Sequence, residues 1–145
     1  MHFVTGGAFN GKRAWVLKTL ITERSNLSWI SAYDGLTLPN DLTHIQEGTI
    51  VLEGIEMWIK ELTTNYPIQQ CRNLWNDRLI KWSQWEHSHG NRNVILIGTD
   101  TSKGIVPLEK EDRTWRDVTG WCYQDLASKS DQIDVIWYGI KQKIK

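Results

Sequence analysis

The feature that most constrains the fold is a glycine-rich segment near the start of the chain. It follows a short apolar run, His2–Thr5, which we expect to form a β-strand, and it opens a helical pattern at Gly11. This order is the context of a phosphate-binding loop. Backbone N–H groups can turn inward around an anion there, and the helix N-terminus adds a positive partial charge. The segment therefore predicts a loop that binds phosphate groups.

The spacing of this segment fits the pattern GxxxxGK through Gly6, Gly11 and Lys12. Lys12 is expected to reach the outer phosphates of a nucleotide. The next position should carry a Ser or Thr whose hydroxyl binds Mg²⁺, but it is Arg13. A guanidinium has no acceptor atom, so Arg13 cannot ligate a metal, although it can pair with phosphate. The predicted nucleotide-binding residues are Gly6, Gly7, Ala8, Phe9, Asn10, Gly11, Lys12 and Arg13. The alternative is a glycine-rich turn that holds no ligand.

Strand and helix patterns alternate along the rest of the chain. Further strands are predicted at Ser28–Tyr33, Thr49–Leu52, Asn93–Gly98 and Gln132–Tyr138. Helices are predicted from Gly11 to Glu23 and at Ile55–Leu62, Pro67–His87 and Leu108–Lys129. The remaining segments, Asp34–Gly48 and Lys141–Lys145, are expected to be a loop and a basic tail. The pattern predicts one α/β domain over residues 1–145, with a mainly parallel sheet flanked by helices.

Composition excludes several classes of protein. The 145 residues carry 17 basic and 17 acidic side chains, which argues against attachment to nucleic acid or an anionic membrane by bulk charge. No apolar run is long enough to span a bilayer, and the start does not resemble a signal peptide. Two cysteines give neither a disulfide framework nor a metal quartet. We therefore expect a cytoplasmic protein.

Polar side chains follow two of the predicted strands. Glu53 ends one strand and Asp100 follows another, where a parallel sheet presents ligand groups, so both are candidate Mg²⁺ ligands. Glu53 could instead be a solvated or capping residue. Glu56 is a poorer candidate, because it lies one helical turn further on. His87 and His89, two positions apart, could hold a metal, but the sequence nearby shows no converging set of ligands.

Tryptophan is unusually abundant, with nine residues. Several lie on the apolar stripe of the predicted helix Pro67–His87, which indicates a core or a subunit interface rather than a stacking site for a ligand.

The sequence resembles the bifunctional adenosylcobinamide kinase/adenosylcobinamide-phosphate guanylyltransferases of cobalamin biosynthesis. Residues 4–12 match the opening strand and loop of that family, and residues 52–55 match its acidic strand end. The more specific match lies in the C-terminal third, at Gly104-Ile105-Val106-Pro107, Arg113, Trp115-Arg116-Asp117, Gly120, Gln124, Leu126-Ala127, Gly139-Ile140 and Ile144-Lys145. Residues 34–48 and 67–87 are not covered convincingly.

The resemblance implies a P-loop, RecA-like sheet, often assembled as a homotrimer. It also implies two reactions: phosphorylation of the aminopropanol hydroxyl of adenosylcobinamide by a nucleoside triphosphate, and transfer of GMP from GTP through a covalent histidine adduct. By position, the glycines and Lys12 would bind phosphates and Glu53 would help to place Mg²⁺. Asp100, Arg116 and Asp117 would lie near the nucleotide or a subunit boundary.

Several positions depart from the family pattern. The histidine between the second and third predicted strands is His44, a candidate for the guanylylated residue without a clear match around it. Arg13 replaces the loop serine, and Tyr123 stands where the family has an asparagine. We therefore expect guanylyl transfer to be lost. Two hypotheses follow: a kinase-type transferase that uses ATP or GTP on a corrinoid, and a degenerate member that acts as a nucleotide-binding, structural or regulatory partner.

Overall fold

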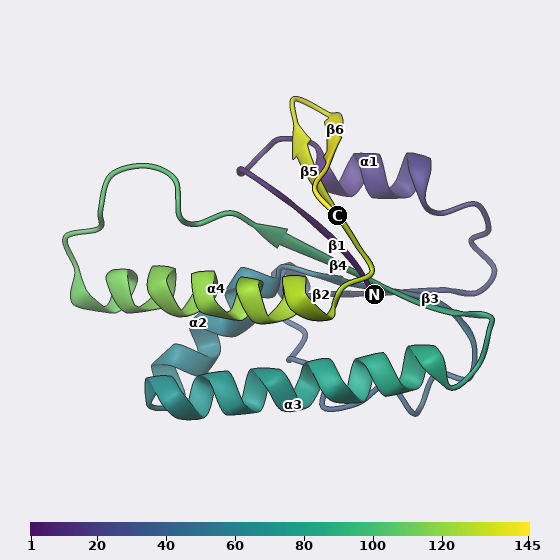
Figure 1. Ribbon diagram of the computed structural model, residues 1–145, viewed down its shortest axis with the longest axis horizontal. Helices are drawn as coiled ribbons and strands as arrows, with labels where there is room; N and C mark the ends of the chain where they lie inside the picture. Colours follow the sequence, from purple (N-terminus) through teal and green to yellow (C-terminus); the bar gives the residue numbers. More distant parts are fainter.

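The computed structural model describes residues 1–145 and places one six-stranded sheet between two layers of helices (Figure 1). The strands are β1 (His2–Gly6), β2 (Leu27–Ser31), β3 (Gly48–Glu53), β4 (Arg92–Thr99), β5 (Gln132–Trp137) and β6 (Ile140–Lys143). The helices are α1 (Lys12–Thr19), α2 (Ile55–Asn65), α3 (Ile68–His87) and α4 (Lys110–Lys129), and a single 3₁₀ turn covers Ala32–Asp34. No helix combines the length and the apolarity that crossing a bilayer requires.

The strands are ordered β2-β3-β4-β1-β5-β6, and β1 to β5 are all parallel. The predicted α/β fold with a mainly parallel sheet flanked by helices is confirmed. β4 lies between β1 and β3. β1 therefore ends, at Gly6, at the same edge of the sheet where β3 ends at Glu53, and one strand separates the two residues. This edge carries the candidate site.

The larger core lies on the face of the sheet that α2, α3 and α4 cover (Figure 1). The α3 stripe predicted to be core is buried: Trp75 and Trp82 are fully inaccessible, and their rings pack edge to face with centroids 5.7 Å apart. Indole N–H groups also fasten the segment between β2 and β3. Trp58 Nε1 donates to the carbonyl of Leu36 and Trp85 Nε1 to that of Ile45, each at 2.8 Å. A stretch with little regular structure is thereby tied to two helices.

The smaller core lies under α1, on the opposite face, where Val16 packs with valines and isoleucines of the central strands. α1 ends at Thr19 rather than at the predicted Glu23. Three of the four residues from Thr19 to Thr22 are β-branched, and this lowers helix propensity where the chain leaves the sheet.

The predicted basic tail is wrong: residues Ile140–Lys143 form β6, antiparallel to β5. The predicted strand to Tyr138 ends at Trp137, because Tyr138 and Gly139 make a two-residue turn with φ of 50° and 74°. All four residues of β6 are exposed, so the strand has no apolar alternation that a sequence pattern would reveal.

Two glycines give a matched test of the backbone. At Gly6, with φ of 141°, an added Cβ would lie 2.3 Å from the carbonyl oxygen of Ile136, whereas at Gly120, inside α4, nothing lies within 4 Å. We expect Gly6→Ala to lower the free energy of unfolding by more than about 2 kcal/mol. Gly120→Ala should raise it by about 0.5–1 kcal/mol. Urea unfolding followed by circular dichroism measures both, and equal effects would contradict the structure.

Both cysteines lie in the larger core, where burial raises their thiol pKa; that of Cys122 rises from an ordinary 9.0 to about 12. Native protein should therefore resist iodoacetamide, and urea-unfolded protein should react at two thiols. Because the folded state holds these protons longer, the free energy of unfolding should fall as pH rises from 9.0 towards about 12. Mass spectrometry counts the alkylated thiols. Rapid labelling of native protein would show that the helices do not cover them.

Candidate nucleotide-binding site

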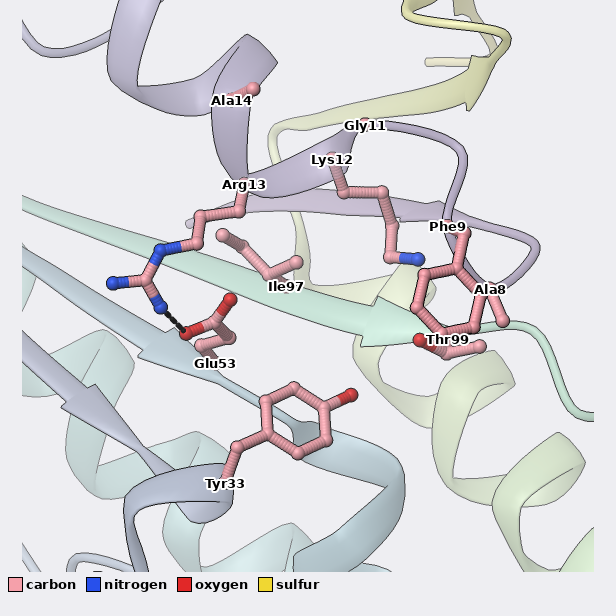
Figure 2. A pocket seen from close by; sticks show the side chains of 10 residues that line it. All are labelled: Ala8, Phe9, Gly11, Lys12, Arg13, Ala14, Tyr33, Glu53, Ile97 and Thr99. Atoms are coloured by element: carbon pink, nitrogen blue, oxygen red, sulfur yellow. Dashed lines mark hydrogen bonds and ion pairs between the residues drawn. The ribbon is translucent and has the colours of Figure 1, made fainter.

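The loop after β1 and the carboxyl ends of β3 and β4 border a cleft of about 630 Å³ beside the first turn of α1 (Figure 2). The cleft brings together residues far apart in the sequence: Ala8, Phe9, Gly11, Lys12, Arg13, Ala14, Tyr33, Glu53, Ile97 and Thr99. Five of the predicted loop residues line it. The other three, Gly6, Gly7 and Asn10, belong to the same loop but do not line the cleft.

The glycine-rich loop, residues 6–13, leads from the end of β1 into α1. Gly11 is the residue before α1, with φ of 86°, and no side chain caps the helix there. The first N–H groups of α1 therefore keep their capacity to donate to an anion. The loop is braced from outside: the Gly139 N–H, in the β5–β6 turn, donates to the Asn10 carbonyl at 2.9 Å.

The Lys12 side chain folds back along this loop. Its Nζ donates to the carbonyl oxygens of Gly6 and Gly7 at 3.2 and 2.8 Å, and Figure 2 shows the ammonium between Phe9 and Ile97. Burial lowers the pKa of Lys12, while the charges of Glu56, Glu53 and Asp100 act in the opposite direction. A cation is thus held at the loop and partly desolvated, which strengthens its attraction for a phosphate.

Arg13 reaches across the cleft to the end of β3. Its Nη1 lies 2.6 Å from Glu53 Oε2 (Figure 2). The Trp29 indole N–H donates to the same oxygen at 2.8 Å. The guanidinium also stacks over Trp29, 4.7 Å from the ring centre. Glu53 is 5% exposed, whereas 56% of the Arg13 side chain is open to solvent.

These side chains do not fit a directly bound Mg²⁺. A metal held by the residue after the loop lysine and by an acidic strand end would lie between position 13 and Glu53. Position 13 offers no oxygen there, and the guanidinium fills that interval. The second predicted ligand, Asp100, lines a different cleft, between β1 and α4, and its Oδ1 accepts from Ser102 N at 2.8 Å. The structure does not bring the two predicted ligands together.

A hydrogen-bonded network around the buried Glu56 supports two residues that line the cleft, Tyr33 and Thr99, and little in the sequence points to it. Glu56, 4% exposed, accepts from the Tyr33 hydroxyl and from the Thr99 N–H, the latter at 2.9 Å. Tyr123 donates to the Thr99 carbonyl at 2.8 Å, across a position where Gly98 leaves room for its ring. Burial raises the pKa of both tyrosines above the ordinary range. No local motif marks this network, because its members come from four separate elements.

Comparison with known proteins identifies the family of the chain. The family model CobU, cobinamide kinase / cobinamide phosphate guanyltransferase, matches residues 22–144. The chain belongs to this family. It is also similar to the bifunctional adenosylcobalamin biosynthesis protein CobP of Pseudomonas aeruginosa, with 24% identity over 87 residues, 52% of this chain and 50% of that protein. The chain thus spans about half the length of the curated relative that it matches.

The resemblance inferred from the sequence is therefore confirmed at the family level. The family match begins at residue 22 and leaves out the glycine-rich loop, so it rests on the later strands and on α2 to α4. Arg116 and Asp117, which the resemblance implied near the nucleotide or a subunit boundary, pair with each other on α4 at 3.1 Å and do not line the cleft.

His44, the candidate for the guanylylated residue, is exposed and lies away from the cleft. The residues after it lie beside the start of β4: Gln46 accepts from Arg92 Nε at 2.8 Å. The cleft lies at the other end of the parallel strands. His2 at the start of β1, His87 at the end of α3 and His89 between α3 and β4 also lie at the far edge. None of the four histidines lines the cleft.

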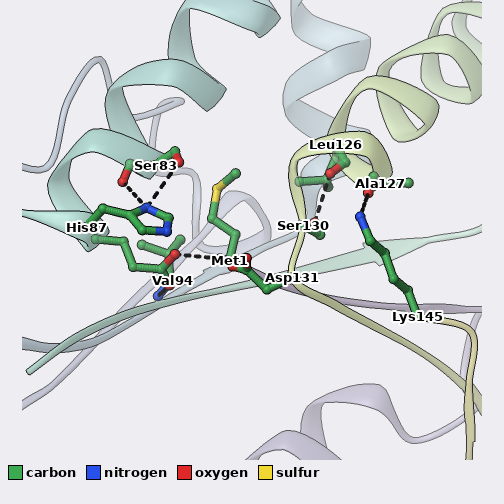
Figure 3. Close-up of polar contacts among 10 residues, drawn as sticks. Met1, Ser83, His87, Val94, Leu126, Ala127, Ser130, Asp131 and Lys145 are labelled. Atoms are coloured by element: carbon green, nitrogen blue, oxygen red, sulfur yellow. Dashed lines mark hydrogen bonds and ion pairs between the residues drawn. The ribbon is translucent and has the colours of Figure 1, made fainter. Parts of the chain in front are cut away.

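A second group of ligand-type side chains lies at that far edge (Figure 3). Glu86, His87 and Asp131 could converge on a cation, but the Met1 ammonium already donates to both carboxylates. His87 Nδ1 is hydrogen bonded to the Ser83 carbonyl at 2.8 Å. The cluster therefore fastens the start of β1 to α3 and to β5.

Proposed function

We propose that this chain is a nucleotide-dependent phosphoryl transferase that phosphorylates a corrinoid of the adenosylcobinamide type, and that it lacks guanylyl transfer. Membership of the family supports the substrate class. The single observation that carries the kinase assignment is the glycine-rich loop itself, with uncapped helix N–H groups and the Lys12 ammonium at one cleft. ATP and GTP are both candidate phosphoryl donors.

The proposed chemistry needs positioning and charge more than covalent steps from the protein. The triphosphate would lie in the loop, where helix N–H groups donate to its oxygens. The Lys12 ammonium would give up its hydrogen bonds to the Gly6 and Gly7 carbonyls and bind the outer phosphates instead. There it would stabilise the negative charge that develops during phosphoryl transfer. The corrinoid hydroxyl would approach from the open side of the cleft.

The absence of guanylyl transfer is proposed because this reaction needs an exposed imidazole at the α-phosphate. All four histidines lie at the opposite edge of the sheet from the loop.

A second function is a nucleotide-binding or structural partner without turnover. The observation in its favour is the ion pair from Arg13 to Glu53, which closes the position that kinases of this fold use for a metal.

The proposal extends to a homo-oligomer, a trimer by family resemblance. Large apolar side chains beside the loop are exposed, among them Phe9, Trp137, Tyr138 and Ile140. Such a group is typical of a surface that another subunit covers.

Turnover of adenosylcobinamide tests the function. The protein is incubated with the corrinoid and ATP or GTP, and the corrinoid is analysed by mass spectrometry. We expect a product heavier by one phosphoryl group, no GMP adduct of the corrinoid, and no acid-labile label on the protein after incubation with labelled GTP. Nucleotide binding without product would favour the partner function, and no binding would exclude both.

A further inference from the structure

The interval between the first turn of α1 and the end of β3 already contains a cation. The Arg13 guanidinium lies there, 2.6 Å from Glu53 and stacked on Trp29. A divalent ion that joined a loop hydroxyl to this carboxylate would require the same space. An arginine at position 13 has two effects: it removes the hydroxyl that would bind a metal, and it supplies a positive charge in the same place.

We propose that this chain binds the triphosphate of its nucleotide without a divalent cation, with Arg13 in the place of the metal and Glu53 as its counter-ion. This inference rests on the proposed function and specifies how that site recognises its ligand.

The arrangement suits a guanidinium that serves a phosphate. Trp29 and Glu53 fix the plane of the Arg13 guanidinium and contact one edge of it. Because the side chain remains 56% exposed, its other N–H groups can reach an anion. Glu53 donates no hydrogen bond to a phosphate and would repel one without its partner. Arg13 neutralises that carboxylate in advance. Together with Lys12, two cations then face the cleft.

The other carboxylates near the cleft already accept hydrogen bonds from the protein. Glu56, the other carboxylate close by, accepts from the Tyr33 hydroxyl and the Thr99 N–H. Asp100 lines the neighbouring cleft and accepts from Ser102. The donors available to the outer phosphates are therefore helix N–H groups, an ammonium and a guanidinium.

Calorimetric titration of the whole chain with inorganic triphosphate and with ATP tests the inference, in EDTA and in millimolar Mg²⁺. We expect binding in EDTA at least as tight as in Mg²⁺. Binding that appears only with Mg²⁺ would overturn the inference and leave the proposed function standing. No binding of either probe under either condition would overturn the proposed function as well.

A pair of variants identifies the residue responsible. Arg13→Ser restores a hydroxyl and frees Glu53, so affinity in EDTA should fall by about tenfold to a hundredfold, because a hydrogen bond between charged groups is lost. Millimolar Mg²⁺ should restore it. The matched double variant, Arg13→Ser with Glu53→Gln, lacks the freed carboxylate and should show little response to Mg²⁺.

Paramagnetic resonance of Mn²⁺ in the presence of triphosphate gives a second readout. The Arg13→Ser variant should immobilise Mn²⁺ at the site, whereas the native chain should not. Circular dichroism checks that each variant is folded. Should a variant fail to fold, the comparison of the native chain in EDTA and Mg²⁺ still decides the question. Equal affinity of native chain and Arg13→Ser in EDTA would show that Arg13 does not contact the phosphates.

Discussion

Under the proposed function, ATP or GTP should raise the melting temperature of the native chain, and Lys12→Ala should abolish that rise and lower kcat for corrinoid phosphorylation by about 10²–10³-fold. The reason is the position of its ammonium, hydrogen bonded to Gly6 and Gly7 at the mouth of the loop. In the proposed binding mode, the nucleotide would lose the cation that leaves these carbonyls for its outer phosphates. Thermal unfolding with and without millimolar nucleotide measures the first effect, and a corrinoid turnover assay measures the second.

Lys18, exposed on the same helix, provides the matched control. Lys18→Ala removes an identical charge from the far end of α1 and should leave both effects intact. Without nucleotide, Lys12→Ala should melt no lower than the native chain, because burial already disfavours the Lys12 charge and lowers its pKa. A nucleotide-induced stabilisation that survives Lys12→Ala would contradict the assignment of the loop.

The largest loss of stability is expected from Trp75→Ala. This side chain is fully buried between α3 and α4, packs on Trp82, and donates its indole N–H to the Cys122 carbonyl at 2.9 Å. Its removal leaves a cavity and an unsatisfied carbonyl, at a cost of about 3–5 kcal/mol in the free energy of unfolding. Trp121→Ala, on the exposed side of α4, should cost less than about 1 kcal/mol. Urea unfolding of the three proteins gives these differences.

A comparison within the same tryptophan pair separates packing from hydrogen bonding. Trp82 is as deeply buried as Trp75, but its indole N–H has no partner. Trp82→Phe thus removes an unsatisfied donor, whereas Trp75→Phe removes a hydrogen bond. Trp75→Phe should therefore lower the free energy of unfolding by about 1 kcal/mol more than Trp82→Phe does. The reverse order would show that the two indoles are placed differently from the structure described above.

The elements that the sequence predicts well are those whose signals are local. The glycine-rich loop, the apolar β4 and the tryptophan stripe of α3 each carry their pattern within one continuous segment, and each forms where expected. β6 lacks such a pattern, because its four side chains are exposed and its stability comes from pairing with β5. A hydrophobicity pattern could not reveal β6, because the strand forms through its hydrogen bonds to β5.

The sequence likewise predicts only part of the candidate site. Position in the sequence places Lys12, Arg13 and Glu53 at one edge of the sheet, but it does not reveal that Arg13 and Glu53 form an ion pair across 40 residues. The network of Glu56 with Tyr33 depends on how α2 and the turn after β2 meet, which no local spacing encodes. The position of His44 follows from indole hydrogen bonds that hold its segment at the far edge.

Two hydrogen bonds join the final hairpin to the glycine-rich loop, from the Gly139 N–H to the Asn10 carbonyl and from the Tyr138 N–H to Asn10 Oδ1. A displacement of the hairpin by a neighbouring subunit or a fused domain would be transmitted to the loop through these two amides. Deuterium uptake at Gly139 would consequently report occupancy of the cleft from a residue that does not line it.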